Sequence, residues 1–435
     1  MLVTALSAKR SRTFSRFEAF VRQLRTRRGG SGQGAINVTP ALNLNGLDLS
    51  LALPRASGAA AHSTVSVFRD LASLAPVWQA LERDGHATVF QSWAVFQSWV
   101  RHIADPQKIT WVVIGLVHAR TGAPLMLLPL AVRRDQGLQT VEFADLGVSD
   151  YNGPVMAASF QPDARDMQRH WADILDALPA GDLLYLAKMP KSVNGQTNPL
   201  LSLAGVHRMN LSAFGTPLSG DWQTWATDTI DAKLLKDIAA RTRKLEKRGR
   251  VTFDVTGDPA AAQPVFEAMC VQRSERHAAM QRQNILARPG YSEFYRALFD
   301  ASDNGAPALI ASLSIDDELI ATGYGLARNN VFHMIFPAFK ADRWRNYSPG
   351  LQLFVRTMRW ALENGFEYFD FTIGAEGFKR ELGATERPLF EKYAALSPRG
   401  LPVIMTSRLK RVVRQSPGMA QWALAALGMP TTGSL

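Results

Sequence analysis

The fold is decided between residues 331 and 373. This region opens on Val331-Phe332-His333-Met334-Ile335-Phe336, a continuous apolar run typical of a central strand covered on both faces. It closes on a second such run, Tyr368-Phe369-Asp370-Phe371-Thr372-Ile373. Between them Ser348-Pro349-Gly350 starts a helix, because Ser348 suits the N-cap and Pro349 suits the first helical position. The inward face of that helix is predicted to consist of Leu351, Phe354, Val355, Met358 and Leu362.

The start of this helix is also a candidate anion site. Free N–H groups and the positive helix end lie at Ser348–Gly350, and the preceding loop carries Lys340, Arg343 and Arg345. Gly350 is expected to let the backbone approach a ligand closely, and a pyrophosphate would suit the site. The Walker lysine and the Gly-x-Gly-x-x-Gly spacing are absent, which argues against a nucleotide triphosphatase or a dinucleotide enzyme. By spacing alone, an ordinary capped helix is the alternative.

The same order of elements occurs twice along the chain. The second half predicts a strand, two helices, a hairpin, and then the decisive region: 251–255, 259–280, 291–300, 308–315 with 319–326, and 331–373. The first half predicts a matching series: 64–68, 71–81, 90–102, 111–117 with 125–132, 138–143, 163–178 and 183–187. Two copies of one α/β unit are therefore expected. Their boundary is predicted near residues 205–225, where Gly215, Pro217 and Gly220 cluster.

The motifs of both halves, taken in order, resemble one family. Ser348-Pro349-Gly350, Phe369-Asp370-Phe371 and Gly374-x-Glu376-x-Phe378-Lys379 with Leu382-Gly383 are similar to the CelD/BcsL branch of the GNAT acyltransferases. Phe90-Gln91-Ser92, with Trp93 and Trp99, and Val148-Ser149-Asp150-Tyr151-Asn152-Gly153-Pro154 resemble its first-domain motifs. The resemblance extends over about residues 65–400 and is shared in part with the Fem-type aminoacyl transferases. It implies an α/β fold of two tandem GNAT-like domains, with mixed central sheets flanked by helices.

The resemblance also implies a donor. Acyl-CoA, expected as acetyl-CoA, would be the co-substrate, with no metal. Strand 331–336 would separate from strand 369–373 so that the pantetheine arm lies between them beside Phe336. The backbone around Ser348, Pro349 and Gly350 would hold the pyrophosphate, with Arg343 and Arg345 at the rim. Ordinary GNAT enzymes carry Arg/Gln-x-x-Gly-x-Gly/Ala at this point, whereas residues 345–350 of this chain contain one glycine.

Acyl transfer needs a base, oxyanion donors and an acid for the leaving thiolate. Asp370, between aromatic residues on a strand, is a candidate catalytic carboxylate or a structural acid paired with Lys379 or Arg380. Glu376 is a candidate for ligand contact or for helix capping. Lys379 is a candidate for binding an acidic substrate group, or is the structural partner of Asp370.

Four further residues complete the candidate site. Tyr324 is a candidate to protonate the thiolate, or is an edge-strand aromatic residue. His333 is a candidate substrate contact, or a core histidine with satisfied hydrogen bonds. Asp150 and Tyr151 lie in the loop 145–154 and are expected to face substrate in a cleft between the two halves.

The charge of the chain is concentrated at its ends. The 435 residues contain 49 Lys+Arg and 38 Asp+Glu, for a formal net charge of +11. Residues 1–28 have a net charge of +7 and residues 399–435 of +5, which leaves the rest at −1. We therefore divide the chain into a basic tail and linker, an N-terminal GNAT-like domain, a C-terminal GNAT-like catalytic domain and a basic, apolar tail: 1–61, 62–215, 216–405 and 406–435. The N-terminal tail is either disordered or an interfacial helix that contacts an anionic membrane or a partner.

Several classes of protein and site are disfavoured. No uncharged apolar run is long enough to cross a bilayer, and the first thirty residues lack the apolar stretch of a secretory signal. Cys270 is the single cysteine and is predicted to be a buried structural thiol, so the cytoplasm is the expected location. Histidine spacing gives no metal site. Residues 241–250 hold six basic residues, which predicts a solvated helix face or a guide for an anionic acceptor or the CoA phosphates. Nucleic-acid binding is disfavoured because no aromatic residue is interleaved.

These features predict an acyltransferase that moves an acetyl group from acyl-CoA to an amine or hydroxyl of a sugar or polysaccharide precursor. The acceptor class follows from the family resemblance alone. Two alternatives stay open: a Fem-like transferase that uses aminoacyl-tRNA, and a non-catalytic scaffold in polysaccharide synthesis. The expected location is the cytoplasm, with peripheral contact at the inner membrane through the basic tails.

Overall fold

The structure is a computed structural model of the chain. It describes residues 63–135, 137–301, 308–340, 343–374 and 377–415, with side chains described as far as residue 408. Glu376 and the predicted N-terminal tail and linker lie outside the described residues, as do residues 416–435 of the predicted C-terminal tail. Within the described ranges, no helix is long and apolar enough to span a membrane.

The described strands form one mixed sheet of 13 strands and a separate two-stranded ribbon. The strands of the first half are β1 Ser63–Phe68, β2 Thr110–His118, β3 Pro124–Asp135, β4 Leu138–Phe143, β5 Val155–Met156, β6 Leu183–Pro190, β7 Ser192–Val193, β8 Gln196–Thr197 and β9 Val206–Pro217. Those of the second half are β10 Val251–Thr256, β11 Ala308–Ile315, β12 Glu318–Arg328, β13 Val331–Phe339, β14 Tyr368–Ile373 and β15 Thr385–Ala395. The order across the large sheet is β1-β2-β3-β4-β6-β15-β9-β14-β13-β12-β11-β10, with β5 beside β3.

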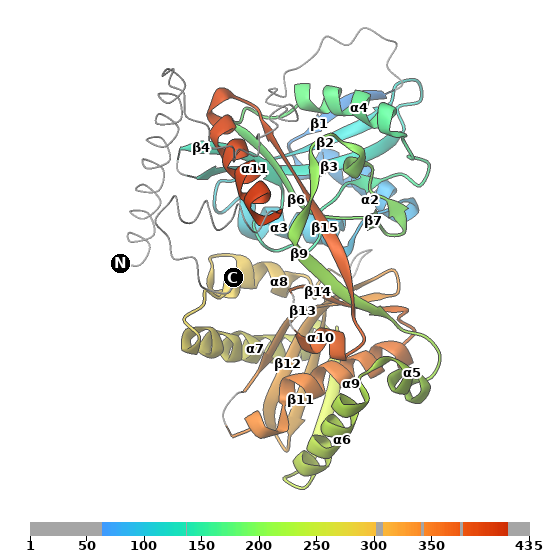
Figure 1. Cartoon of the computed structure of the whole chain (residues 1–435), viewed down its shortest axis with the longest axis vertical. Helices are drawn as coiled ribbons and strands as arrows, with labels where there is room; N and C mark the ends of the chain where they lie inside the picture. Colours follow the sequence, from blue (N-terminus) through green and yellow to red (C-terminus); the bar gives the residue numbers. More distant parts are fainter. Residues whose placement is uncertain (1–62, 136, 302–307, 341–342, 375–376, 416–435) are drawn as a thin grey trace, which may run out of the picture. The chain divides into compact units, whose positions relative to one another are not determined.

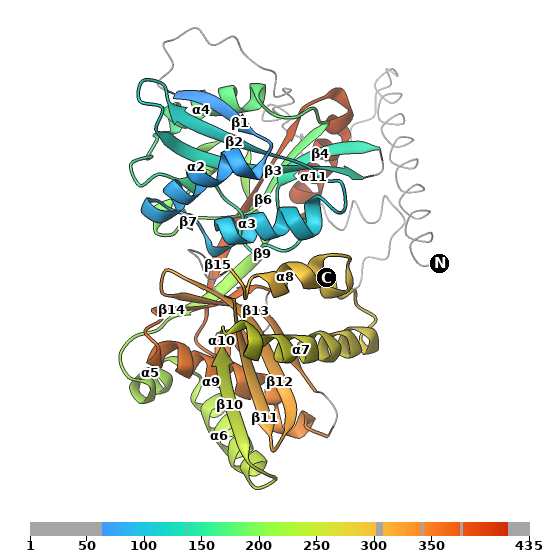
Figure 2. The same ribbon diagram turned by 180° about the vertical axis from the view of Figure 1, so that it is seen from behind.

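Helices cover both faces of this sheet (Figure 1; Figure 2 shows the reverse side). In chain order they are α2 Leu71–Asp84, α3 Trp93–Trp99, α4 Ala164–Asp176, α5 Trp222–Thr229, α6 Ala232–Glu246, α7 Pro259–Ala279, α8 Tyr291–Ala297, α9 Pro349–Glu363, α10 Gly377–Glu381 and α11 Leu401–Gln415. Shorter helical turns are η3 Val89–Gln91, η4 Val100–Ala104, η5 Pro199–Ser202, η6 Ile285–Ala287, η7 Arg345–Tyr347 and η8 Pro398–Gly400. The predicted α/β class, a mixed sheet flanked by helices, is confirmed.

The two halves repeat one arrangement, as the sequence predicted. In the first, hairpin β2–β3 leads to β4, helix α4 and strand β6, which pairs parallel with β4. In the second, hairpin β11–β12 leads to β13, helix α9 and strand β14, which pairs parallel with β13. Each parallel pair needs a crossover connection, and a helix supplies it in both halves.

The last strand of each half pairs with the other half. Strand β15 of the second half is hydrogen-bonded to β6 of the first, and β9 of the first half is hydrogen-bonded to β14 of the second. The two exchanged strands also pair with each other. Figure 1 shows both of them between β6 and β14. Neither exchanged strand was among the predicted elements.

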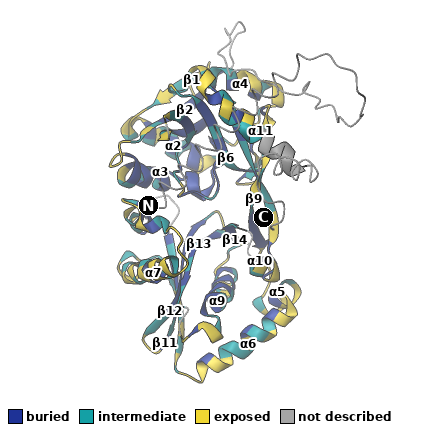
Figure 3. Ribbon diagram, turned by 60° about the vertical axis from the view of Figure 1, so that its left-hand side comes forward, coloured by how far each residue is buried: buried dark blue, intermediate teal, exposed yellow. Residues whose placement is uncertain are grey.

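Helices α7 and α9 pack on opposite faces of the second half of the sheet (Figure 3). Phe266 of α7 belongs to one buried cluster with Tyr324, whereas Leu353 of α9 belongs to another with Ala321. Since alternate residues of a strand point to opposite faces, one core lies on each side of β12.

A bulge in β13 reverses the direction of its side chains. Met334 pairs with Gly325, but Phe336 pairs with Tyr324, so Ile335 is an extra residue. Before the bulge, Phe332 and Met334 join the α9-side cluster; after it, Phe336 and Ala338 join the α7-side cluster. The bulge therefore directs the second half of β13 towards α7.

The inward face of α9 is only partly as predicted. Phe354 and Met358 are buried, but Leu351, Val355 and Leu362 are only partly buried. The other fully covered positions of the helix are Pro349, Gly350, Gln352, Leu353, Thr357 and Ala361. Small and polar residues fill much of this face because α6 and η7 pack against the start of the helix.

Candidate functional site

Strands β13 and β14 separate at the centre of the sheet. Their parallel pairing covers only Val331–His333 against Tyr368–Asp370, although β13 continues to Phe339. Beyond His333, one edge of β13 therefore has no neighbouring strand in the described residues. This is the separation that the family resemblance implied.

Thr372 and Asp370 fix the point of separation. Thr372 has a φ of 57°, which is rare for a β-branched residue and costs on the order of 1–3 kcal/mol. The N–H of Thr372 donates to Asp370 Oδ1 at 2.7 Å, and its hydroxyl donates to the Met334 carbonyl at 3.3 Å. These two bonds hold β14 in a bend away from β13.

The carboxylate of Asp370 is completely buried and fully bonded. Oδ1 also accepts a 2.7 Å hydrogen bond from the Tyr151 hydroxyl, and Oδ2 lies 3.3 Å from Arg387 of β15. Its ion pair is thus with Arg387, whereas the sequence suggested Lys379 or Arg380 as structural partner. Burial, and next Asp370, raise the pKa of Tyr151, so its phenol stays neutral and acts as donor.

His333 and Tyr151 come together beside Asp370. The ring of Phe90, in η3, lies edge-on to both, with centroids 5.5 Å from Tyr151 and 5.8 Å from His333. The Nδ1 of His333 is 3.2 Å from the Leu326 carbonyl, and burial lowers the pKa of the imidazole. Because a carbonyl only accepts, Nδ1 carries the proton of the neutral ring.

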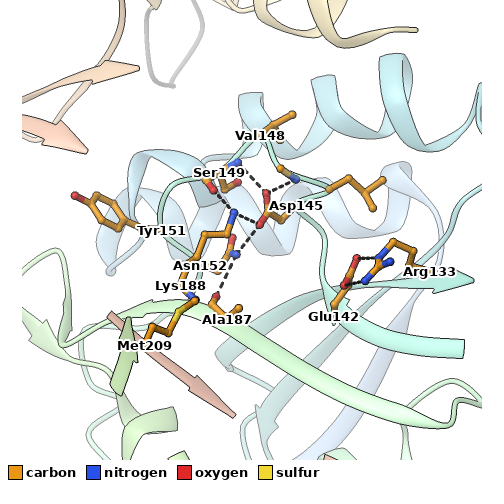
Figure 4. Close-up of polar contacts among 12 residues, drawn as sticks. Arg133, Glu142, Asp145, Val148, Ser149, Tyr151, Asn152, Ala187, Lys188 and Met209 are labelled. Carbon is orange, nitrogen blue, oxygen red and sulfur yellow. Dashed lines mark hydrogen bonds and ion pairs between the residues drawn. The ribbon is translucent and has the colours of Figure 1, made fainter. Parts of the chain in front are cut away.

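The loop that carries Asp150 and Tyr151 is braced by Asp145 (Figure 4). Oδ1 of Asp145 accepts from the N–H groups of Gly147 and Ser149 at 2.8 and 2.9 Å. Oδ2 accepts from Asn152 at 2.9 Å and pairs with the Lys188 ammonium. The same ammonium donates to the Ser149 carbonyl at 2.5 Å. Four hydrogen bonds and one ion pair thus brace the loop.

The two motifs quoted from the first half meet at this loop. The Gln91 amide donates to the Tyr151 carbonyl at 3.0 Å. On the other side, the Tyr295 hydroxyl of α8 donates to the Val148 carbonyl at 3.2 Å. The loop is therefore held by both halves of the described unit, as expected for a site between them.

Asp150 has the proton affinity of a general base. It is half-buried, and its pKa is raised from 3.8 to about 6, chiefly by burial. Lys188 and a hydrogen bond with the Thr372 side chain lower the pKa in part, whereas Asp145 and Asp370 raise it. A carboxyl group with a pKa near 6 is mostly ionised at neutral pH, so it can accept a proton and release it again.

The N-terminus of α9 differs from the prediction in detail. Ser348 adopts a left-handed conformation (φ 49°, ψ 57°), and its side chain makes no capping bond to the helix. Instead its hydroxyl bonds to the guanidinium of Arg241 on α6. The N–H groups of Gly350 and Leu351 have no acceptor within the described part of the chain. These two donors and the nearby guanidinium fit an anionic group.

Gly350 is required by packing. A Cβ at this position would lie 2.6 Å from the ring of Phe339, so the ring of Phe339 takes the space that we expected a ligand to need. The neighbouring Gln352 is buried and bonds to Tyr347 and Thr242. The basic stretch 241–250 thus packs partly against the start of α9.

The other predicted residues lie in different surroundings. Arg343 pairs with Glu318, which also bonds Lys340 at 2.8 Å, and Arg345 is exposed. Phe336 is buried on the α7 side, 4.8 Å from the ring of Tyr295.

Tyr324 and Lys379 are both buried. Tyr324 lies in an inner strand, not an edge strand, and its hydroxyl donates to the Tyr295 carbonyl at 3.0 Å. Lys379 donates to the carbonyls of Phe371, Ile373 and Gly374 at 3.0–3.1 Å, which holds the end of β14.

Four of the candidate residues lie near one another in the structure: Asp150, Tyr151, His333 and Asp370. The sequence did not single out Asp145, Lys188 and Arg387, which brace or neutralise them, and it pointed to Arg241 only as part of the basic stretch 241–250. Asp145 had a local signal, since an Asp followed by small residues typically accepts from the next N–H groups. Arg387 had none, because its strand was not predicted. In the described residues no group of His, Cys, Asp and Glu is placed to hold a metal ion.

Comparison with known proteins identifies a domain in the second half. Residues 232–380 match a family model described as an acetyltransferase (GNAT) domain. This segment includes β13, α9 and β14, which surround the separation of the sheet. A comparison with curated proteins gave no sequence match.

Solved structures are similar in fold at low sequence identity. FemX has 10% identity and a TM-score of 0.50 over 75% of this chain and 96% of its own. L-PGS from Bacillus licheniformis has 15% identity and a TM-score of 0.46 over 78% of this chain and 95% of its own. A tandem GNAT protein from the clavulanic acid biosynthesis pathway has 13% identity and a TM-score of 0.40 over 77% and 99%. The chain therefore carries a GNAT-type acetyltransferase domain within a fold similar to that of FemX.

Proposed function

We propose that this protein transfers an acyl group from acyl-CoA, with acetyl-CoA as the first donor to test, to an amine or hydroxyl of a sugar or polysaccharide precursor. The observation that supports this most is the unpaired edge of β13 beyond His333, next to the N-terminus of α9. An extended, amide-containing arm can pair with an open strand edge, and a pyrophosphate can accept from free N–H groups at a helix start.

The residues around the helix start fit such a donor. Gly350 and Leu351 offer two N–H groups, and the guanidinium of Arg241 is held at the Ser348 hydroxyl. When bound, the thioester would supply the activated acyl group. Phe336 follows the bulge and packs against Tyr295 of α8. It would therefore form part of the wall of the site on the α7 side of β13.

The carboxylates of the site have separate tasks. Asp150 would accept the proton of the attacking amine or hydroxyl, because its pKa is about 6 and it is partly exposed. Asp370 would position Tyr151 and Thr372 without contacting substrate, since both of its oxygens are bonded and it has no exposed surface.

Calorimetric titration with acetyl-CoA tests the donor. Gly350→Glu is unsuitable as a blocking variant because any side chain there meets Phe339. Ser348→Asp is better, since a carboxylate in place of the hydroxyl would pair with the Arg241 guanidinium and put a negative charge where the donor phosphates are proposed to bind. We expect acetyl-CoA to bind the wild type and Ser348→Asn, and to bind Ser348→Asp at least tenfold more weakly at an unchanged Tm.

No binding of acetyl-CoA to the wild type at millimolar concentration would end the acyl-CoA proposal. The Fem-like alternative is supported by the similarity in fold to FemX. It would be preferred if aminoacyl-tRNA bound to the wild type while acetyl-CoA did not. The acyl group is proposed to pass directly from donor to acceptor, with no covalent enzyme intermediate. A labelled acyl group that stayed on the enzyme during turnover would contradict this mechanism.

A further inference from the structure

Helix α7 presents arginine residues that have no acidic partner. Arg273 and Arg276 lie on the side of α7 that faces β13, and Arg282 follows the helix. In the part of the chain that the structure describes, no ion pair includes any of these three. Burial, and next the charge of Arg282, lower the pKa of Arg276; burial, and next the arginine charges, also lower the pKa of the His277 imidazole.

Arg273 is the most enclosed of the group. Its guanidinium lies 4.4 Å from the ring centroid of Phe336 and donates to the Pro337 carbonyl at 3.4 Å. Its Nε is buried and has no hydrogen-bond partner. Burial is the main factor that lowers the pKa of Arg273, and repulsion from Arg276 adds to it.

This arrangement is unfavourable for an isolated fold. A charge that loses water without gaining a partner destabilises the native state, and buried charges in proteins are normally paired. Like charges on successive turns of one helix repel as well. Such a cluster is therefore expected where a negatively charged ligand completes it.

Contacts connect the cluster to the candidate site. The ring of Phe336 below Arg273 also touches Tyr295, whose hydroxyl holds the loop of Asp150 at the Val148 carbonyl. Arg276 lies 4.0 Å from the ring centroid of Phe339, at the end of the unpaired edge of β13. The guanidinium groups thus line the α7 side of the unpaired part of β13, and the Phe339 ring that contacts Arg276 also packs against Gly350 at the start of α9.

We propose that Arg273 and Arg276 bind an anionic group of the acceptor, a phosphoryl or carboxylate, while its nucleophile is directed to Asp150. The inference rests on the proposed acyl transfer. It adds the class of acceptor: an amine or hydroxyl compound that carries a negative charge. The planar guanidinium forks suit bidentate contacts with phosphoryl or carboxylate oxygens.

Inorganic pyrophosphate is the probe. It is titrated into the full chain saturated with CoA, so that the α9 start is already filled by the donor phosphates. Three proteins are compared: the wild type, Arg273→Gln/Arg276→Gln, and Arg69→Gln/Arg83→Gln, which removes two exposed arginines elsewhere. We expect binding to the wild type and the control, a loss of at least tenfold in the α7 double variant, and CoA affinity within threefold in all.

Thermal unfolding separates a binding role from a structural one. Because the variant loses an unpaired, desolvated charge, its Tm is expected to equal or exceed that of the wild type. A Tm lowered by more than about 5 °C would mark the arginines as structural and overturn the proposal. An Arg273→Lys/Arg276→Lys variant, which keeps the charge, should retain part of the affinity.

Two other results would overturn it. One is that pyrophosphate binds the α7 double variant as tightly as the wild type. The other is a tenfold loss of CoA affinity in that variant, which would assign the cluster to the donor. If CoA fails to bind the wild type, the acyl-CoA proposal fails separately. The arginine cluster is then tested by the same pyrophosphate comparison in a Ser348→Asp background, where the α9 start is blocked.

Discussion

Two carboxylates lie in one network at the centre of this site, and their surroundings give them different tasks. Asp370 accepts from a phenol, a backbone N–H and a guanidinium, so its negative charge is fully stabilised. Asp150 is half-buried with fewer stabilising contacts, and its pKa is raised to about 6. A carboxyl group whose pKa is raised towards neutrality is suited to accept and release a proton, and this assigns proton transfer to Asp150.

Asp150→Asn is expected to lower the turnover rate about 10²- to 10³-fold, the usual contribution of a general base. In the wild type, the rate should rise as pH increases through about 6, because the carboxylate must be ionised to accept a proton. That rise should vanish in the variant. Initial rates of CoA release between pH 5 and 8 measure both effects. Unchanged rates in Asp150→Asn would remove Asp150 from the reaction, and the exposed Asp84→Asn serves as control.

The same substitution has an opposite effect on stability. The native pKa of Asp150 lies above its ordinary value of 3.8, so the native state holds its proton more tightly than the unfolded state. The native state therefore loses stability as pH rises from about 4 to 6, by on the order of 1–3 kcal/mol. Denaturant unfolding at pH 7 should show Asp150→Asn to be more stable than the wild type, with no difference near pH 3.5.

The sequence pointed to individual residues near the site but did not reveal their contacts. Asp150, Tyr151 and Asp370 stood out as polar residues within apolar or turn-rich motifs. Nothing in the sequence shows that Tyr151 would reach across to Asp370, more than two hundred positions away. The left-handed Thr372 was equally unpredictable, since a threonine in an apolar run signals an ordinary strand residue.

At the scale of elements, the bulge in β13 connects the unpaired edge of this strand, where the donor is proposed to bind, with Arg273 and Arg276 of α7. If side chains alternated regularly through Ile335, Phe336 would point to α9 along with Phe332 and Met334. Because Ile335 is bulged, Phe336 points to α7 instead and contacts the guanidinium of Arg273. The run 331–336 predicted the strand correctly. Because the run is apolar throughout, its pattern does not show where the side chains change from one face of the sheet to the other.

The close approach of α9 to β13 depends on Gly350. Gly350→Ala is expected to destabilise the protein by about 1–3 kcal/mol, because the new Cβ would lie 2.6 Å from the Phe339 ring. The cost should fall when Phe339 is replaced by Leu, and a double-mutant cycle by chemical unfolding measures the difference. Gly377→Ala, where a Cβ would meet nothing within 4 Å, is the matched control and should be neutral or slightly stabilising. Equal costs in both Phe339 backgrounds would show that the ring does not define this contact.

Elements with clear periodicity were predicted and those with mixed polarity were missed. The hairpins, α9 and β14 follow their apolar patterns closely. Strand β15 contains Pro388 and several charged residues, a composition typical of a loop. Other strands of the sheet pair those charges: Arg208 of the adjacent β9 with Glu386, and Asp370 of β14, beyond β9, with Arg387. A central strand can carry charge when other strands of its sheet supply the partners, and those partners are distant in sequence.

At the scale of the whole described unit, the exchange of β9 and β15 unites the two halves. A cut near the predicted boundary would leave β6 and β14 with open edges, since each is completed by a strand of the other half. A buried ion pair between Glu82 of α2 and Arg328 of β12 adds a further link between the halves.

We therefore expect one cooperative unfolding transition. Differential scanning calorimetry should give a calorimetric enthalpy equal to the van't Hoff enthalpy for the full chain. A chain that ends at residue 384, before β15, should lose the cooperative transition of both halves. A truncated chain that kept a stable first half, with its own separate transition, would show that the exchanged strand is dispensable there.

The exchange also sets an order for synthesis on the ribosome. Strand β6 ends at Pro190, but the strand that covers its edge begins only at Thr385. During translation that edge stays open until nearly the whole described chain has emerged, and open strand edges invite association with other chains. We therefore expect the nascent protein to need chaperones that cover this edge. Slow elongation near the end of the message should lower the soluble yield more than slow elongation near its start.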